Sequence, residues 1–542
     1  MLLVAFGEVG FAIPMLRLEY NFIVIGGGSA GCLLARQLVE SQCGTVALVE
    51  AGDSTNVGKV DVRTVVPAYY PKTFGSSLDW AFSTDPQTGL NGRRIAWPRG
   101  LTLGGCGAIN AMIYLQAAAS DFDRWAAAGC TGWDWQSIKR FLSTKPLAPS
   151  SCPVSELPLA EIAQPHPWSR AFIAACNSYG LKTRSPWLQA EQEACGFYSL
   201  TQRDGRRQHT GRQLAELLPN KNLALIRGAR VRDLKVVRGR ITSVRLIDDS
   251  NQPTELNADG EVILCAGTIG TPSILLRSGI GPATTLRSLG IAVEHDLSGV
   301  GENLQDHLMY PLVFRTHAGD GLPARFNATD RQHFRRPEPE FGLGPLASNI
   351  AEAGALWHNP KTSATNPDFQ IHFTPTHYLK YPSRDAPANC LTLAVNDLHP
   401  RSRGRLKLVN TDPYAAPLID PGYLQQPEDV PRLLSGIDAC REIANQASLR
   451  VLIADEILPG RKRLEPETVL RSVRMFAQSI YHPVGTCRMG NDSQAVVDAK
   501  LQVHGLTNLH VADASVLPDL PSANTQAVTF LVAARKFHWL KR

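Results

Sequence analysis

A glycine-rich turn near the N-terminus constrains this chain more than any other feature. In "NFIVIGGGSAGCLLARQLVES" (21–41), a β-prone run ends at Gly26, Gly28 and Gly31, and a helix-like segment follows. In the register G-x-G-x-x-G, the first glycine permits a tight turn, the second lets the backbone approach a pyrophosphate, and the third lets helix and strand pack closely. The unpaired N–H groups at the start of the helix then face the phosphates. The pattern predicts a dinucleotide-binding unit.

A second β-prone run, "TVALVEAG" (45–52), follows the helix and carries Glu50 near its end. A carboxylate at this point accepts hydrogen bonds from the ribose hydroxyls of a bound dinucleotide. The same carboxylate disfavours a 2′-phosphate, which argues against NADP and leaves FAD and NAD both open. Because strand, glycines, helix, strand and acid occur in order, a glycine turn that binds no nucleotide is the minor alternative.

Composition is that of an enzyme-sized globular protein with more than one domain. The chain has 542 residues, 44 of them Gly and 37 Pro, which favours many turns over a helical bundle. The net charge of +6 is spread over the whole length, so we expect no nucleic-acid partner. The 11 cysteines show no metal-binding spacing, which predicts reduced thiols, a cytoplasmic location and no metal site.

The N-terminal apolar stretch is too short and too interrupted for a membrane-spanning helix, so no transmembrane segment is expected. Its charge pattern also fits a secretory signal poorly. Met15 is an alternative start, which would make residues 1–14 an artefact.

Further β-prone segments lie at 222–267 and 391–408, and near the C-terminus a strand, "NLHVADAS", precedes a helix, "NTQAVTFLVAARKF". We expect 391–408 to form two strands joined by a turn within a separate antiparallel sheet. The run 317–345, rich in proline and charge, is expected to be a connection or lid. The predicted class is α/β, with a Rossmann-type nucleotide-binding domain and an α+β substrate domain that holds a large antiparallel sheet. The expected pieces are 15–142, 201–310 and 478–542 for the first domain, and 143–200 and 311–477 for the second.

Two other motifs carry chemistry. "PRGLTLGGCGAINAMIY" (98–114) turns at Gly104 and Gly105 before an apolar segment, and its spacing does not separate a second dinucleotide loop from a simple bend. "SIYHPVGTCRMG" (479–490) sets His482 between a tyrosine and a proline. A lone histidine in such a place is more often packed than catalytic, unless a cofactor lies opposite it.

From about residue 20 onward the chain resembles the glucose–methanol–choline oxidoreductases, FAD enzymes that oxidise alcohols. Its C-terminal block is most similar to bacterial oxidases of aromatic or furanic primary alcohols, and next to choline-type dehydrogenases. The resemblance favours FAD over NAD. The stretches that carry it are "GCGAINAMIY" (105–114), "GTIGTPSILLRSGIG" (267–281), "GVGENLQDH" (299–307), "GPLASNIAEAG" (344–354), "SRGRLKL" (402–408), "YHPVGTCRMG" (481–490) and "VADASVLPDLPSAN" (511–524).

The resemblance implies which residues hold FAD. The residues expected around the cofactor are Gly26, Gly28, Ser29, Ala30, Gly31, Glu50 and Ala51 at its ADP part, Val231 near the adenine, Gly104, Gly105, Asn110 and Ala111 near the flavin, and Ala266, Gly267, Asp513, Ala514, Asn524 and Thr525 beside these. The chain departs from the family twice. Gly100-Leu101 replaces a frequent Gly-Arg or Gly-Lys, and Ile109 stands where some members carry a histidine bonded to the flavin. FAD is therefore expected to be non-covalent.

By the same resemblance, His482 is the base that removes the hydroxyl proton of a small primary alcohol, and Asn524 orients the substrate oxygen. The hydride would pass to flavin N5 and give an aldehyde. His307 and His399 are rival bases in contexts that look structural. Three alternatives are a lyase of the same fold that resembles hydroxynitrile lyases, a fatty-acid photodecarboxylase, and a non-catalytic flavoprotein. The identity of the alcohol, the acceptor (oxygen, or a quinone or dye) and the state (monomer or homodimer) are left open.

Overall fold

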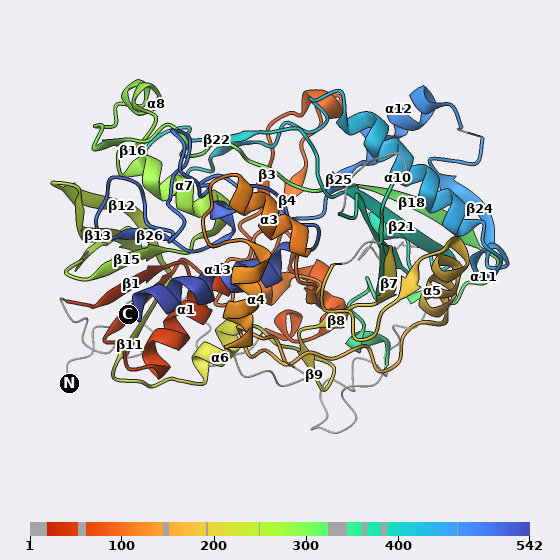
Figure 1. The fold of residues 1–542 in the computed structure, drawn as a ribbon, viewed down its shortest axis with the longest axis horizontal. Coiled ribbons are helices and arrows are strands. Elements are labelled where there is room, and N and C mark those ends of the chain that lie inside the picture. The colour runs from red at the N-terminus through yellow and green to blue at the C-terminus, as the bar shows by residue number, and fades with distance from the viewer. Residues whose placement is uncertain are drawn as a thin grey trace.

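Two sheets organise the chain, seen side by side in the computed structural model in Figure 1. The structure describes residues 19–52, 61–144, 151–190, 193–248, 250–322, 344–359, 366–380, 387–462 and 464–541. The alternative start at Met15, and most of the predicted lid at 317–345, lie outside these residues.

The first sheet is five-stranded and parallel, and its strand order is β11-β2-β1-β15-β26. Its strands come from distant parts of the chain: β1 (Phe22–Ile25), β2 (Val46–Glu50), β11 (Leu223–Arg227), β15 (Glu261–Leu264) and β26 (Leu509–Val511). Strands β1 and β2 are buried along their whole length, which explains their unbroken apolar runs, since a parallel sheet is covered on both faces.

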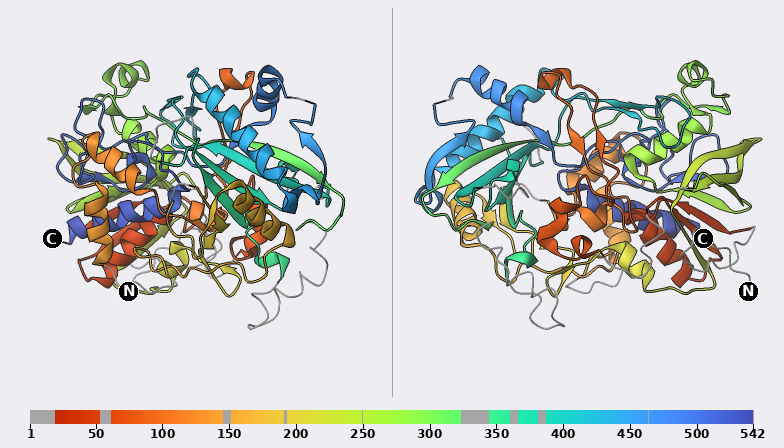
Figure 2. Two further views of the ribbon diagram at one scale, coloured as in Figure 1. Left: turned by 45° about the vertical axis from the view of Figure 1, so that its right-hand side comes forward. Right: turned by 180° about the vertical axis from the view of Figure 1, so that it is seen from behind.

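Helices cover the parallel sheet on both sides. In Figures 1 and 2, α1 (Ser29–Glu40) and α13 (Thr525–Leu540) lie on one side, and α7 (Gly267–Arg277) lies on the other. The predicted strand, turn, helix and strand of 21–52 are thus β1, α1 and β2. The predicted C-terminal strand and helix are β26 and α13.

The β-prone segment 222–267 divides between two sheets. Its first and last strands, β11 and β15, join the parallel sheet, whereas β12 (Ala229–Val237), β13 (Arg240–Asp248) and β14 (Pro253–Asn257) form a separate antiparallel sheet. Arg238 and Gly239 connect β12 to β13 and both have positive φ, at 51° and 74°, as a two-residue hairpin turn requires.

The second large sheet has eight strands in the order β24-β18-β21-β20-β19-β7-β6, with β25 paired to β18. Every pair in it is antiparallel except β6 with β7. The helices α5 (Pro167–Tyr179), α10 (Asp429–Ala444) and α11 (Ala447–Arg450) lie against its outer side in Figures 1 and 2. Its strands are β6 (Lys182–Thr183), β7 (Ala194–Phe197), β18 (Leu308–Thr316), β19 (Ala353–Trp357), β20 (Phe369–Thr374), β21 (Cys390–Asp397), β24 (Ile453–Leu458) and β25 (Gln478–Ser479). A parallel α/β half and a large antiparallel sheet confirm the predicted fold class.

The predicted hairpin at 391–408 is wrong. Only β21 belongs to the large sheet, and β22 (Arg405–Lys407) pairs instead with β23 (Leu418–Asp420). The carboxylate of Asp429, at the start of α10, accepts hydrogen bonds from the backbone N–H groups of Arg401 (2.6 Å) and Ser402 (3.0 Å). These bonds hold the segment that connects β21 to β22. Because β21 already pairs with β18 on one side and with β20 on the other, it has no free edge for β22.

The remaining elements are short and connect or cover the two sheets. Helices among them are α2 (Cys106–Ile109), α3 (Ala119–Ala127), α4 (Trp135–Ser143), α6 (Thr210–Ala215), α8 (Ala283–Ser288) and α12 (Pro466–Phe476); strands are β3 (Phe82–Ser83), β4 (Ala96–Trp97), β5 (Ile113–Tyr114), β8 (Ser199–Leu200), β9 (Gln202–Arg203), β10 (Arg206–Arg207), β16 (Ile280–Gly281) and β17 (His295–Asp296). Within the described ranges, no helix has the length and apolar character needed to span a membrane, and no His, Cys, Asp and Glu side chains cluster as a metal site would need.

Candidate active site

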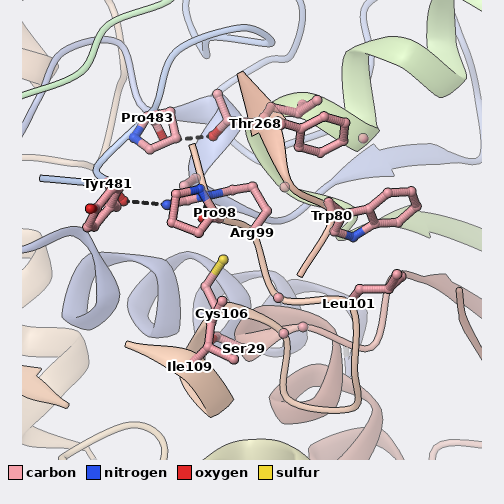
Figure 3. A pocket seen from close by; sticks show the side chains of 18 of the residues that line it. Ser29, Trp80, Pro98, Arg99, Leu101, Cys106, Ile109, Thr268, Tyr481 and Pro483 are labelled. Carbon is pink, nitrogen blue, oxygen red and sulfur yellow. Dashed lines mark hydrogen bonds between the residues drawn. The ribbon is translucent and has the colours of Figure 1, made fainter. Parts of the chain in front are cut away.

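A cavity of about 610 Å³ lies between the two sheets. On one side it is lined by the carboxyl ends of the parallel strands, including Ile25, Glu50 and Cys265, where open α/β sheets bind their ligands. On the other side it is lined by His372 and Ala394 of the antiparallel sheet. Figure 3 shows part of the wall between these ends, including Ser29 and Ile109. The cavity is therefore the place where the two halves of the molecule meet.

The start of α1 opens onto this cavity. Gly28, Ser29 and Ala30 line it, no side chain caps the helix N-terminus, and no acid lies in its first turn. Gly26 has φ +103°, and a Cβ at Gly31 would lie 1.9 Å from the carbonyl oxygen of Gly26. These glycines thus bring the backbone N–H groups of the first turn to the cavity, and an anion such as a pyrophosphate fits there.

Glu50 ends β2 at the cavity wall and is buried. Its Oε2 accepts the N–H of Gly27 (2.8 Å) and its Oε1 accepts the N–H of Gly52 (2.7 Å). Burial raises the pKa of Glu50 to about 7, and the two backbone donors oppose that rise. Because each carboxylate oxygen has a second lone pair, Glu50 can still accept hydrogen bonds from ribose hydroxyls.

In the second glycine-rich turn, Gly105 lines the cavity but Gly104 does not. Gly104 has φ +94°, and a Cβ there would lie 2.3 Å from Nδ1 of His209, so this glycine faces away from the cavity, which Gly105 lines. The buried guanidinium of Arg207 donates to the Oδ1 of Asn110 (2.8 Å) and to its carbonyl oxygen (2.5 Å). The segment that enters the cavity is therefore held from behind by a buried cation.

His482, three residues after β25 of the eight-stranded sheet, lines the reaction end of the cavity and is buried. Nδ2 of Asn524, at the start of α13, is 3.1 Å from His482 Nε2. Nδ1 of His307 is 2.9 Å from His482 Nδ1. The carboxylate of Asp306 accepts the backbone N–H of His482 (2.7 Å). The histidine is thus held at its backbone and at both ring nitrogens.

Neighbouring bonds define the tautomer of His482. His307 Nε2 lies 3.2 Å from the carbonyl oxygen of Leu398, which can only accept, so His307 carries its hydrogen on Nε2 and accepts at Nδ1. His482 therefore donates from Nδ1 and keeps the lone pair on Nε2. Gln370 Nε2 donates to Asn524 Oδ1 (3.1 Å), which turns the Asn524 amide N–H toward that lone pair.

Burial keeps His482 uncharged. It lowers the pKa of His482 well below 6.5, and the nearby His307, His372 and Arg99 act in the same direction. Burial likewise lowers the pKa of His307 to about 3. A neutral imidazole with an available lone pair at Nε2 is the form that a general base requires.

Two family models match the chain, both described as GMC oxidoreductase, over residues 20–309 and 400–533. The chain belongs to the GMC oxidoreductase family. It is 35% identical over 529 residues to an alcohol dehydrogenase [acceptor] of Pseudomonas putida, covering 95% of this chain and 94% of that one. It is 34% identical to an oxygen-dependent choline dehydrogenase of Chromohalobacter salexigens, with the same coverage. Among solved structures, pyridoxine 4-oxidase from Mesorbium loti superposes with a TM-score of 0.83 at 29% identity, covering 96% of this chain and 99% of that one.

Membership in the GMC oxidoreductases confirms the resemblance found in the sequence, with its class of enzyme and its cofactor. The chain is an FAD-dependent oxidoreductase that acts on CH–OH donors. The cavity fits FAD, because it joins an uncapped helix N-terminus, a buried carboxylate at a strand end and a glycine turn. The residues of the predicted set that line it are Gly26, Gly28, Ser29, Ala30, Glu50, Ala51, Gly105, Asn110, Ala111, Val231, Ala266, Gly267, His482, Asp513, Ala514, Asn524 and Thr525.

Gly31 and Gly104 do not line the cavity of this GMC oxidoreductase, and both act through packing. Asp513 accepts the N–H of Gly267 (2.8 Å) at Oδ2, as expected of a carboxylate that orders backbone near the cofactor. Arg99, two places before the position of the family's usual cation, donates from Nη2 to the carbonyl oxygen of Tyr481 (2.8 Å; Figure 3). It therefore supports the loop that carries His482.

The sequence prediction gave no role in the site to several side chains that lie at the reaction end. His307 looked structural, yet it contacts His482 directly. His372, on β20, lines the cavity, as do four aromatic residues: Tyr70, Phe74, Tyr378 and Tyr481. The alternation in "FQIHFT" (369–374) is a strand signal, but it does not say which face meets the cofactor.

Proposed function

We propose that this GMC oxidoreductase oxidises a small primary alcohol to the aldehyde, with His482 as the base and Asn524 as the donor to the substrate oxygen. The observation that carries the proposal is the contact of 3.1 Å between His482 Nε2 and Asn524 Nδ2 at the wall of the cavity. A hydroxyl group that enters between them donates its hydrogen to His482 Nε2 and accepts one from Asn524. The contact between His482 and Asn524 is thereby replaced by two hydrogen bonds to the hydroxyl group, and these two bonds orient the substrate oxygen.

The chain's own residues then manage the proton. His482 Nε2 takes the hydroxyl proton, and its Nδ1–H stays bonded to the neutral His307. The amide N–H of Asn524 stabilises the negative charge that develops on the oxygen, and Gln370 holds that amide in place. When bound, FAD supplies the acceptor for the hydride of the substrate carbon. The wall around the pair is buried, which keeps water from competing for the proton.

The variant His482→Ala tests the base. FAD should stay bound at the level of the unaltered protein, because no contact of the glycine turn or of Glu50 involves His482. Reduction of the flavin by alcohol should fall by about 10²- to 10⁴-fold, the usual contribution of a general base. Anaerobic mixing with a panel of alcohols, followed by flavin absorbance, measures this. Unchanged bleaching in the variant contradicts the role of His482.

We also propose that FAD is held without a covalent bond. Ile109 lines the cavity and is aliphatic, so it offers no nucleophile to the flavin at the position where some relatives carry histidine. After acid precipitation the yellow colour should stay in the supernatant, and a yellow pellet would refute the proposal.

The predicted domain pieces stay a proposal, and sheet membership supports them. Strands of the parallel sheet come from 15–142, 201–310 and 478–542, while most strands of the eight-stranded sheet come from 143–200 and 311–477. Because β18 begins at Leu308, we propose 307 in place of 310 as the end of the middle piece. Limited proteolysis of the holoenzyme, with fragments identified by mass, maps these boundaries.

Acceptor, location and assembly are likewise proposals. The relatives are named for different acceptors, so oxygen consumption and dye reduction should be scored separately for each alcohol.

All 11 cysteines are free, which supports a cytoplasmic location. A monomer or a homodimer is expected, and light scattering of the holoenzyme distinguishes them.

A further inference from the structure

One buried polar atom at the reaction end has no use in the proposed chemistry: Nε2 of His372. The His372 side chain is 3% exposed and lines the cavity. Its Nδ1 contacts the hydroxyl of Tyr198 (3.1 Å), but its Nε2 has no hydrogen-bond partner among the described residues. An unpaired buried donor or acceptor costs free energy, which a ligand group of opposite kind recovers.

The position of His372 on β20 places its side chain on the same face of the sheet as a residue that contacts Asn524. Gln370, His372 and Thr374 alternate along β20, so they share one face. Gln370 on that face reaches the catalytic candidate Asn524, and Thr374 lines the same cavity. The side chain of His372 therefore lies next to that of Gln370, two residues earlier on the same face of β20, and Gln370 contacts Asn524.

Small neighbours leave room around the imidazole. His372 pairs with Gly354 on β19 and with Ala394 on β21. A Cβ at Gly354 would lie 1.9 Å from the Tyr198 hydroxyl oxygen, so the glycine is what admits that hydroxyl beside His372. The tyrosine thus supports the ring from behind, at the nitrogen remote from Nε2.

The hydroxyl of Tyr198 also defines the tautomer. Gln370 Nε2 donates to this hydroxyl (3.2 Å), which leaves the tyrosine to donate its own hydrogen. Nδ1 of His372, at 3.1 Å, is the nearer acceptor, since the carbonyl oxygen of Ile371 lies 3.5 Å away. Nδ1 accepts, so the hydrogen of His372 is on Nε2. Burial lowers the pKa of His372 to about 3, and the ring is a neutral donor across the working pH range.

Several aromatic side chains line the same cavity as this donor. Phe74 contacts Tyr70 edge to face (ring centroids 5.9 Å apart) and Tyr481 likewise (5.3 Å), and Tyr378 lines the same cavity. Flat rings are the surfaces against which an aromatic substrate packs well. A neutral N–H pairs best with a neutral acceptor, because it offers no charge to balance a carboxylate.

We propose that the substrate is a primary alcohol on an aromatic ring that carries a second, neutral hydrogen-bond acceptor, such as a ring nitrogen or a carbonyl oxygen, and that His372 Nε2–H binds this acceptor. The proposal rests on the proposed alcohol oxidation and adds the class of substrate. His372 is then a specificity residue of the same site.

The test compares near-isosteric alcohols on the holoenzyme. Benzyl alcohol has no ring acceptor, whereas the ortho, meta and para pyridinemethanols place a nitrogen at different points of the same ring. In the unaltered enzyme at least one pyridinemethanol should exceed benzyl alcohol in kcat/KM by about tenfold, the worth of one neutral hydrogen bond. His372→Leu should abolish that preference by lowering kcat/KM for the preferred pyridinemethanol more than for benzyl alcohol, and His372→Gln, which keeps an N–H, should restore part of it.

His399→Leu is the matched control. His399 is also a mostly buried imidazole, bonded to a hydroxyl through Ser522 (3.1 Å), but it does not line the cavity. This variant should keep the preference. The binding of two non-oxidised analogues, isonicotinamide and benzamide, measured by flavin absorbance, gives the same comparison without turnover.

The outcomes separate the two levels of the proposal. If no pyridinemethanol is preferred over benzyl alcohol in the unaltered enzyme, or if His372→Leu slows all alcohols equally, His372 has no role in selecting the substrate. The first of these results needs no variant, so it decides the matter even if His372→Leu fails to fold. If no alcohol at all reduces the flavin, the proposed function itself fails.

Discussion

The two ends of the cavity are built in different ways. At the nucleotide end, one continuous segment supplies the start of α1 and Glu50, and the contacts run through backbone N–H groups. At the reaction end, His482, His307 and Asn524 come from three distant segments and meet through side chains. A cradle made of backbone depends on the absence of side chains, whereas a reaction centre depends on which side chains are present and how their hydrogens are directed.

The largest expected effect is at the nucleotide end. Gly31→Ala places a Cβ 1.9 Å from the carbonyl oxygen of Gly26, so α1 must shift away from the turn. We expect purified Gly31→Ala to lose FAD almost completely, and its melting temperature to fall, as steric clashes in a core usually cost about 1–3 kcal/mol. The ratio of flavin to protein absorbance measures the loss. Full FAD occupancy would show that backbone geometry does not limit binding there.

A smaller effect is expected from a positioning residue at the reaction end. His307→Leu removes the acceptor of the His482 Nδ1–H, so the tautomer with the lone pair on Nε2 is no longer favoured. The rate of flavin reduction by alcohol should fall by about a hundredfold, with the KM for alcohol nearly constant because Asn524 still binds the oxygen. Rapid-mixing kinetics and FAD occupancy distinguish this from a folding defect. Equal losses in KM and in FAD binding would contradict the assignment.

The smallest effect concerns pH. Burial lowers the pKa of His482 well below 6.5, so its neutral, active form persists as the pH falls through 6.5. A plot of kcat/KM for alcohol against pH should therefore show its acid limb well below the ordinary histidine value of 6.5. FAD retention, which does not depend on His482, should not follow that limb. An acid limb centred at 6.5 would mean that His482 is solvated or is not the base.

The fold and the nucleotide end could largely be predicted from local sequence. Gly26, Gly28, Gly31 and Glu50 act within some thirty residues, and their meaning follows from sterics that hold in any such turn. The pairing of β22 could not be predicted, because both edges of β21 are occupied by β18 and β20, which lie far from β22 along the chain. Which strands pair depends on contacts between residues that are far apart along the chain.

By itself, the sequence determined that this chain binds a dinucleotide at a glycine turn, and by resemblance that the dinucleotide is FAD and the substrate an alcohol. Only the tertiary structure decided which imidazoles face one another, which nitrogen of His482 carries the lone pair, and that His372 Nε2 lines the cavity without a hydrogen-bond partner among the described residues. The physical reason is that a turn's conformation is local. The direction of a hydrogen bond is decided by whichever donor or acceptor the fold places within about 3 Å.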